Sequence, residues 1–331
     1  MTKPRVLVTG GYGFLGQAIV QRLLAREWQV RILARRPSSQ LSHPLLEFCP
    51  GDISDAATVE AAVKDCDHVI HVAAKAGVWG PASEYEKINV VGTKNLLAAS
   101  ERAHVQTFVH TSTPSVVFNG EAFRGADESL PYGKNWLGAY AETKARAEQA
   151  VLAAAKPDFR VCALRPHLIW GPGDPHIFPR LLNRARQGRL RIIGNGLNLV
   201  DVTHVDTAAD AHLQALDALL AQRANGKAYF ISQGHPVLLW DFINALLKGA
   251  GLPPVTKRIS LGAAYTMASG LETVWSLLRL RHEPPMTRFV AVELAKDHWF
   301  NIQAAQRDLG LRPAHETWSA LESLAAGLRV K

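Results

Sequence analysis

The chain has 331 residues, of which 47% are hydrophobic and 20% are charged. These values are typical of a globular protein with about two lobes and exclude a disordered or fibrous chain. The formal net charge of +8 favours an anionic partner such as a nucleotide phosphate, a carboxylate, coenzyme A or an acidic lipid surface. Because the basic residues are scattered and no nucleic-acid-binding motif is present, we expect no nucleic-acid partner.

Cys49, Cys66 and Cys162 lie far apart, and no Cys-x-x-Cys motif is present. This spacing argues against a disulfide framework and against a zinc site, so we expect no metal and a reducing compartment. The N-terminus runs directly into an apolar strand and has no signal-peptide pattern, which predicts a cytoplasmic location.

Apolar runs and helical patterns alternate over the first half of the chain. Strands are predicted at 5–9, 29–34, 67–73, 107–111 and 160–164, and helices at 15–26, 55–64, 84–103 and 138–155. Such alternation predicts βαβ crossovers and an α/β fold with a doubly wound parallel sheet of the Rossmann type.

The regular alternation of strands and helices ends after residue 166. A loop at 171–175 precedes a predicted helix at 176–187, and a second helix at 207–221 is predicted to begin with Asp206 as its cap. A further strand is predicted at 229–231, and the rest of the chain is mainly helical. We therefore predict a nucleotide-binding domain over 1–165, to which 197–222 returns, and a smaller, mainly helical substrate lobe over 166–196 and 223–331.

Residues 259–278 carry one charge, Glu272, and are flanked by basic residues, among them Lys257, Arg258, Arg279 and Arg281. The segment contains too many glycines, serines and threonines for a bilayer span. Three interpretations remain open: a buried helix or dimer face, a lid over an apolar substrate, and a helix lying in a membrane surface.

Thr9, Gly10, Gly13 and Gly16 form a glycine fingerprint between the first strand and the first helix. Gly10 permits a tight turn, Gly13 lets a pyrophosphate approach the backbone, and Gly16 allows close packing of helix and strand. The position at the start of a βαβ unit indicates a dinucleotide site.

The end of the second strand carries Arg35 and Arg36 where an NAD site usually has an acidic residue for the ribose hydroxyls. Two arginines suit the 2′-phosphate of NADP, although two solvated loop arginines are the alternative. Asp52 and Ile53 close the following strand; Asp52 could accept from the adenine amino group, or serve as a turn or cap residue, or do both.

Tyr140 and Lys144 lie four residues apart, so they share one face of a helix. An ammonium about 4 Å from a phenol is worth roughly 4 kcal/mol at an effective dielectric of about 20. Such a neighbour is expected to lower the phenol pKa toward neutrality, where a proton donor to a carbonyl is most effective. Three hydroxyls, Thr111, Ser112 and Thr113, end a strand about thirty residues earlier.

With these motifs the chain resembles the extended short-chain dehydrogenase/reductases over essentially its full length. The matching segments are the glycine fingerprint, Gly51-Asp52, residues 71–74, residues 89–93, the three hydroxyls, Tyr140-x-x-x-Lys144 and residues 165–172. The resemblance implies that Thr113 orients the substrate oxygen, that Tyr140 donates the proton, and that Lys144 lowers the Tyr140 pKa and holds the nicotinamide ribose. The cofactor residues that it implies are Gly10, Tyr12, Gly13, Phe14, Leu15, Gly16, Arg35, Arg36, Asp52, Ile53, Ala73, Ala74, Lys75, Ser112, Tyr140, Lys144, Pro166 and Leu168.

Sugar-nucleotide enzymes of this family usually carry an arginine where this chain has Val200, next to Asp201. An apolar side chain cannot replace a bidentate phosphate contact, so a sugar nucleotide is disfavoured. The chain more closely resembles the 3β-hydroxysteroid dehydrogenase-like branch, and within it the 2-alkyl-3-oxoalkanoate reductases of bacterial long-chain olefin biosynthesis, through residues 74–80, 111–116, 168–174, 184–190 and 278–288.

That resemblance implies NADPH-dependent reduction of the 3-keto group of a hydrophobic 2-alkyl-3-oxoalkanoate, with NAD as the less favoured cofactor. It also implies assembly with other enzymes of olefin synthesis, and we expect a homodimer. A cation should bind the substrate carboxylate, and Lys75, Arg180 and Arg184 are candidates. The alternatives are a 3β-hydroxysteroid or sterol-carboxylate dehydrogenase, a sugar-nucleotide epimerase or dehydratase, and a non-enzymatic NADP sensor.

Overall fold

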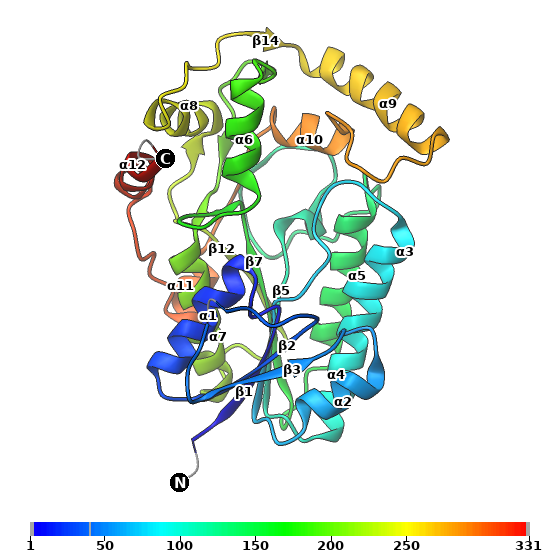
Figure 1. The fold of residues 1–331 in the computed structure, drawn as a ribbon, viewed down its shortest axis with the longest axis vertical. Helices are drawn as coiled ribbons and strands as arrows, with labels where there is room; N and C mark the ends of the chain where they lie inside the picture. Colours follow the sequence, from blue (N-terminus) through cyan, green and yellow to red (C-terminus); the bar gives the residue numbers. More distant parts are fainter. Residues whose placement is uncertain (1–2, 40, 329–331) are drawn as a thin grey trace.

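The computed structural model describes residues 3–39 and 41–328. Its centre is a sheet of seven strands, all parallel, in the order β12-β7-β5-β4-β1-β2-β3 (Figure 1). The strands are β1 (Arg5–Thr9), β2 (Gln29–Ala34), β3 (Leu46–Pro50), β4 (His68–His71), β5 (Thr107–Thr111), β7 (Arg160–Pro166) and β12 (Lys227–Ile231). The predicted doubly wound parallel sheet is confirmed.

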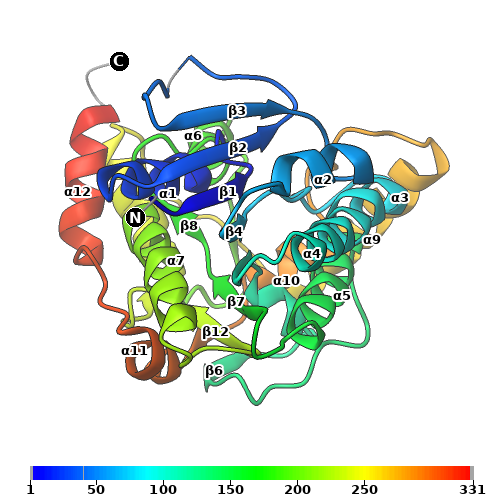
Figure 2. The same ribbon diagram turned by 90° about the horizontal axis from the view of Figure 1, so that it is seen from below.

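Helices cover both faces of this sheet, which is why its inner strands are almost entirely buried. On one face lie α1 (Phe14–Ala25), α7 (Val205–Leu220) and α11 (Gln303–Leu309), and on the other lie α2 (Ala56–Val63), α4 (Gly92–Arg102) and α5 (Ala139–Ala153) (Figure 2). Two hydrophobic clusters fill the two layers between sheet and helices. The short helix α3 (Ala82–Tyr85) and a π-helical segment (Glu86–Val91) lead into α4.

A third hydrophobic cluster lies beyond the carboxyl ends of the strands, around Trp170, Phe178, Val200 and Trp240. Its helices are α6 (Ile177–Arg186), α8 (Leu239–Gly249), α9 (Leu261–Leu277), α10 (Arg288–Glu293) and α12 (Thr317–Leu328). This part also contains short strands. One sheet is formed by β6 (Phe123–Ala126), β10 (Leu199–Val200), β13 (Val237–Leu238) and β15 (His298–Phe300). In addition, β8 (Ile169–Trp170) pairs with β11 (Thr203–His204), and β9 (Ile192–Ile193) pairs with β14 (Arg258–Ile259). The domain boundaries given above stay a prediction.

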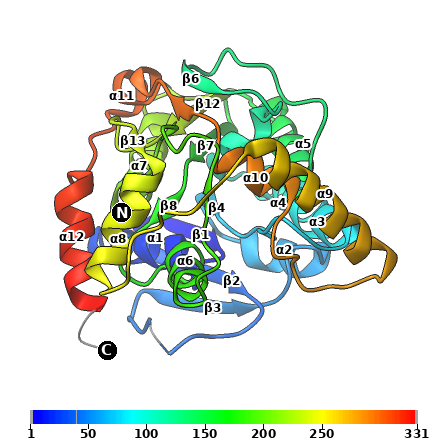
Figure 3. The same ribbon diagram turned by 90° about the horizontal axis from the view of Figure 1, so that it is seen from above.

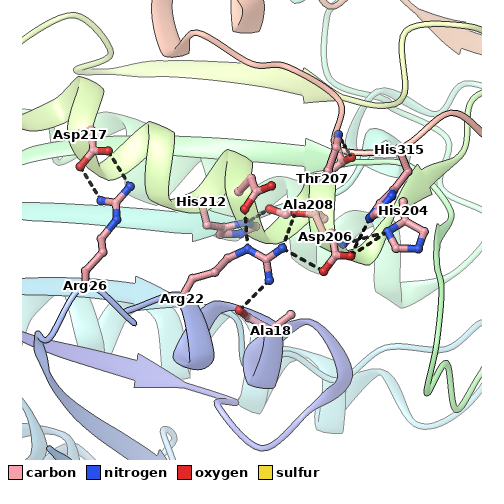
Figure 4. Close-up of polar contacts among 12 residues, drawn as sticks. Ala18, Arg22, Arg26, His204, Asp206, Thr207, Ala208, His212, Asp217 and His315 are labelled. Atoms are coloured by element: carbon pink, nitrogen blue, oxygen red, sulfur yellow. Dashed lines mark hydrogen bonds and ion pairs between the residues drawn. The ribbon is translucent and has the colours of Figure 1, made fainter. Parts of the chain in front are cut away.

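Arg22 of α1 and Arg26, the residue after its end, hold this helix against α7 (Figure 4). Arg22 forms ion pairs with Asp210 and, at 2.9 Å, with Asp206, while Arg26 contacts Asp217 at 2.9 Å. These contacts fix the glycine turn, which directly precedes α1, relative to the remainder of the sheet.

The predicted cap of α7 is wrong. The helix begins at Val205, and the His204 side chain accepts a hydrogen bond from the Asp206 backbone N–H at 3.3 Å. Asp206 instead lies in the first turn, where Arg22 and the His315 ring bind its carboxylate (Figure 4). A partner from another helix has therefore overridden the local capping preference.

Helix α9 spans most of the segment that has a single charge and packs on α10 (Figure 3). Only Ala264, Ala268 and Glu272 of this helix are buried, and Met267 and Leu277 are 48% and 77% exposed. Helix α9 is therefore not wholly buried. Within the described residues, no helix combines the length and apolar character needed to cross a membrane.

Candidate active site

A cavity of about 950 Å³ opens at the carboxyl ends of β1, β2, β3 and β4. Of the predicted cofactor residues, Gly10, Tyr12, Gly13, Arg35, Arg36, Asp52, Ile53, Ala73, Ala74 and Lys75 line it. Leu33, Ala34, Glu84, Lys87 and Ile88 also line it and were not singled out in the sequence, since no motif marks them.

The glycine turn has the geometry that its sequence predicts. Gly10 has a φ of +69°, and a Cβ there would lie 2.9 Å from the Ala73 nitrogen. A Cβ on Gly16 would lie 2.1 Å from the Gly10 carbonyl oxygen, so any side chain would push α1 away from the turn. Gly13 is the residue before α1, so the N-terminus of this helix faces the cavity, as an anionic pyrophosphate requires.

Arg35 and Arg36 are exposed at the rim of the same cavity. Asp52 accepts hydrogen bonds from the Ser54 backbone N–H at 2.9 Å and the Ser54 hydroxyl at 2.8 Å. Burial would raise the Asp52 pKa, but these bonds and the charges of Arg35 and Lys87 lower it. Asp52 therefore serves as a turn residue and also lines the cavity as an anion.

The other predicted cofactor residues do not line this cavity. Leu15 and Gly16 are buried in α1, Phe14 is half-buried beside them, and Pro166 is buried at the end of β7. Leu168 has a φ of +45° and lines a separate apolar pocket. The buried Ser112 hydroxyl has no hydrogen-bond partner within the described part of the chain. A nicotinamide cofactor fits these features, since it offers a phosphate for the glycine turn and polar groups for Ser112.

Tyr140 lies in the first turn of α5 and is brought to the hydroxyl cluster as predicted. The Thr113 side chain accepts from the Ser115 backbone N–H at 3.3 Å and is hydrogen-bonded to Tyr140. Burial raises the Tyr140 pKa, and the Thr113 hydrogen bond opposes that rise. The phenol therefore stays protonated at neutral pH, as a proton donor must.

Lys144 is 2% exposed, one helical turn beyond Tyr140. Its ammonium donates to the Thr111 carbonyl at 2.6 Å and contacts His110 Nε2 at 3.2 Å. Burial lowers the Lys144 pKa to about 8, against the raising effect of Glu148. The expected lowering of the Tyr140 pKa by Lys144 is not found, because burial of the phenol dominates and raises that pKa.

Three polar residues that hold this centre together were not predicted from the sequence: Glu148, Asn89 and His110. Glu148, on α5, receives hydrogen bonds from Arg165 at 2.6 Å and from Tyr132 at 2.8 Å, which ties α5 to β7. Asn89 donates to Thr143 at 3.1 Å. Asn89 is in a segment that supports the family resemblance, so a signal for it existed; Glu148 and His110 carried none.

A second cavity, of about 820 Å³, lies between α5 and α9 and has Tyr140 in its wall. The loop before α3 contributes Trp79, and α9 contributes Glu272 and Trp275. The Trp79 indole donates to the Leu280 carbonyl at 3.0 Å, which joins the walls directly. Helix α9 thus forms one wall of the cavity. In Figures 1 and 3 this helix lies beside α10, at the edge of the molecule.

Three arginines line this second cavity. Arg288 forms an ion pair with Glu272 at 2.6 Å, whereas Arg279 and Arg281 form no ion pair with any described residue. The predicted carboxylate partners lie elsewhere: Lys75 pairs with Glu84, Arg180 with Glu283, and Arg184 donates to the Pro285 carbonyl.

Two groups of side chains outside these cavities could in principle hold a metal ion. In one, His167 Nε2 and His298 Nδ1 are 2.5 Å apart and His298 Nε2 is 2.6 Å from the Glu293 carbonyl oxygen. In the other, His204 and His315 flank Asp206. These contacts satisfy the side chains by hydrogen bonding, and the absence of a metal stays a prediction.

Similarity to known proteins identifies the family. Residues 7–261 match the model of the "3-beta hydroxysteroid dehydrogenase/isomerase family". A 2-alkyl-3-oxoalkanoate reductase of Stenotrophomonas maltophilia is 45% identical over 97% of this chain and 98% of its own length. A 3 beta-hydroxysteroid dehydrogenase/Delta 5-->4-isomerase of Mycobacterium tuberculosis is 39% identical over 96% of this chain and 88% of its own.

Solved structures give the same fold. MoeE5, determined in complex with UDP-glucuronic acid and NAD, matches with a TM-score of 0.75 and 27% identity, covering 98% of this chain and 99% of that one. The family match and the two relatives carry the identification, and the chain is an oxidoreductase acting between an alcohol and a carbonyl. It belongs to the 3-beta hydroxysteroid dehydrogenase/isomerase family.

Proposed function

We propose that the protein reduces the 3-keto group of a hydrophobic 2-alkyl-3-oxoalkanoate to the 2-alkyl-3-hydroxyalkanoate with NADPH. The observation that carries this proposal is the cavity under α9, which combines Tyr140, two indoles and two unpaired arginines. A β-keto acid with two alkyl chains needs such an apolar space, a proton donor and a cation. The identity to a reductase of that name supports the same substrate class.

The cavity at the glycine turn is the proposed NADPH site. The glycines and the N-terminus of α1 would hold the pyrophosphate, and Arg35 with Arg36 would bind the 2′-phosphate. Ser112 and Lys144 would contact the nicotinamide end. When bound, NADPH supplies the hydride that reduces the carbonyl carbon.

Residues of this chain would supply the proton that the substrate oxygen takes up. Thr113 is hydrogen-bonded to Tyr140 and would hold the substrate oxygen beside the phenol. Tyr140, protonated at neutral pH, would give its proton to that oxygen as negative charge develops there. The Lys144 ammonium, held by the Thr111 carbonyl and His110, would bind the nicotinamide ribose.

Arg279 and Arg281 are the proposed partners of the substrate carboxylate. Arg288 already neutralises Glu272, so it has less to offer an added anion. In a β-keto acid the carboxylate lies two bonds from the carbonyl carbon, so carboxylate binding also positions the carbonyl near Tyr140.

A hydroxysteroid dehydrogenase activity is the second candidate, because the Mycobacterium tuberculosis relative of that name is 39% identical. A rigid, uncharged sterol would fill the apolar cavity but leave both arginines unused. A sugar nucleotide is less favoured, since Val200 is fully buried in β10 and offers no phosphate contact.

A homodimer and assembly with enzymes of olefin synthesis stay proposals. So does contact with a membrane surface, for which the exposed Met267, Val274 and Leu277 on α9 are candidates.

The test is a panel of a 2-alkyl-3-oxo acid, a 3-keto-steroid and a UDP-sugar, each with NADPH and with NADH. We expect turnover of the keto acid with NADPH, measured as the hydroxy acid by mass spectrometry. Faster turnover of the steroid, or of the UDP-sugar, would replace the proposal with the corresponding alternative.

A further inference from the structure

A buried chain of histidines lies beneath the proposed catalytic centre. His71 is on β4, His110 is on β5 directly opposite it in the sheet register, and the two rings are 5.2 Å apart. His212 of α7 contacts the Thr111 hydroxyl at 2.8 Å. All three histidines are buried at 1% exposure or less, and the proposed reaction gives none of them a role.

His110 differs from the other two histidines in what it contacts. Both nitrogens of His71 have threonine partners, Thr9 at 2.7 Å and Thr93 at 2.9 Å. Both nitrogens of His212 are also bound, one to Thr111 and the other to the Ala208 carbonyl. His110 Nε2 contacts the Lys144 ammonium at 3.2 Å, and its Nδ1 is buried without a partner among the described residues.

This pattern sets the roles in the His110–Lys144 contact. An ammonium can only donate, so His110 Nε2 accepts and the proton of the neutral ring lies on Nδ1. The Thr111 carbonyl accepts a second N–H of Lys144, and the His212 contact holds Thr111 in place. Two of the three N–H groups are thus used in fixing the side chain, and the third is left for the reaction.

We infer that His110 is a positioning residue for the proposed reduction: its Nε2 accepts a hydrogen bond from Lys144 and so keeps that buried side chain charged and fixed. This inference rests on the proposed function only for the role of Lys144. A leucine at position 110 would remove the acceptor and leave the ammonium with one uncharged partner in a site closed to water.

The titration of Lys144 can be distinguished from that of the groups that face it. Glu148 on α5 raises the Lys144 pKa, and Tyr140 lies one turn before it. Burial holds the pKa of His71 near 3, that of His212 near 4 and that of His110 well below its usual value. These rings therefore stay neutral from about pH 5 upward, and the Tyr140 pKa is raised by burial, so a titration near pH 8 belongs to Lys144.

The test follows the Lys144 titration by NMR of the lysine side-chain carbons in the cofactor-free protein, with the Lys144→Met variant used for assignment. We expect His110→Leu to lower the midpoint by about one pH unit or more, because it removes a hydrogen bond that favours the charged form. His110→Gln, which retains an acceptor, should keep the midpoint near that of the wild type. The basic limb of kcat/KM for the keto acid should move down in pH with the midpoint.

His68→Leu is the matched control. Like His110, His68 is a buried histidine of the β4–β5 strand pair, but it lies on β4, at the opposite end of the pair. It contacts Thr107 on β5 at 3.0 Å. It should reduce the melting temperature without moving the Lys144 midpoint. An unchanged midpoint in folded His110→Leu, or an equal shift in His68→Leu, would overturn the inference, while failure of the keto acid assay alone would count only against the proposed function.

Discussion

The two cavities are built from different kinds of structure. The cavity at the glycine turn is bordered by four parallel strands, whose ends are fixed by the sheet register and by the ion pairs between α1 and α7. The wall that α9 and its flanking loop give to the other cavity is held by individual contacts, among them the Trp79–Leu280 hydrogen bond and the Glu272–Arg288 ion pair. Tyr140, in the wall of the second cavity, lies one turn of α5 before Lys144, whose ammonium contacts the end of β5.

This difference assigns separate tasks to the two regions. A site made of strand ends and a glycine turn presents fixed backbone donors, which suits a cofactor of constant shape. A wall made of one helix with an exposed outer face can change its side chains with little effect on the sheet. Substrate choice should therefore depend on α9 and the loop after it, and cofactor choice on the end of β2.

The largest effect should come from the residue nearest to both regions. Tyr140→Phe removes the proton donor, so turnover of the keto acid should fall by about 10²–10⁴-fold. NADPH affinity, measured by fluorescence titration, should stay within a few-fold of the wild type because the glycine turn is untouched. Retained turnover would refute the assignment of Tyr140.

The cofactor cavity is tested by changing Arg35 and Arg36 together to alanine. Loss of charged hydrogen bonds to the 2′-phosphate should raise the KM for NADPH by about 100-fold and leave the KM for NADH nearly unchanged. Arg186→Ala with Arg189→Ala makes the same change in net charge on exposed arginines outside the cavity and serves as the control. Equal effects on the two cofactors would contradict the 2′-phosphate role.

The substrate cavity is tested at its unpaired cations. Arg281→Gln should raise the KM for the 2-alkyl-3-oxo acid by about tenfold but leave that for its methyl ester unchanged, since only the acid carries the charge. Arg258→Gln, an exposed arginine just before α9, is the matched control. If acid and ester respond alike, Arg281 does not bind the carboxylate.

The smallest effect should come from the ion pair that anchors α9. Glu272→Gln weakens the contact with Arg288, so KM values for bulky uncharged substrates, such as the methyl ester and the 3-keto-steroid, should rise about two- to five-fold. NADPH affinity should not change, because Glu272 lines only the second cavity. A comparable loss of NADPH affinity would show that the two regions are coupled and not separate.

The cofactor cavity was predictable because its signals are local. Gly10, Gly13 and Gly16 fall in one strand–turn–helix, and Tyr140 and Lys144 occupy one helix face, so spacing alone relates them. The parallel sheet follows from alternating apolar runs. Each of these inferences needs only a short stretch of chain and the periodicity of a single element.

The substrate cavity and the polar centre were not predictable in the same way. Arg281 meets Tyr140 in one cavity only through the path of α9, so its membership of the resembling segment 278–288 did not indicate this placement. His110 reaches Lys144 because β5 and α5 pack together, a contact between residues 34 positions apart. The Asp206 cap failed for the same reason, since Arg22 is 184 residues away.

The most direct test of the proposed reduction follows the hydrogen that is transferred. NADPH carrying deuterium at C4 of the nicotinamide, labelled on one face or on the other, is incubated with a 2-alkyl-3-oxo acid, and the product is examined by mass spectrometry. We predict a 2-alkyl-3-hydroxy acid with one deuterium at C3, from one of the two labelled cofactors only, and no such product with Tyr140→Phe. A wild-type product without deuterium at C3, or no hydroxy acid at all, would contradict it.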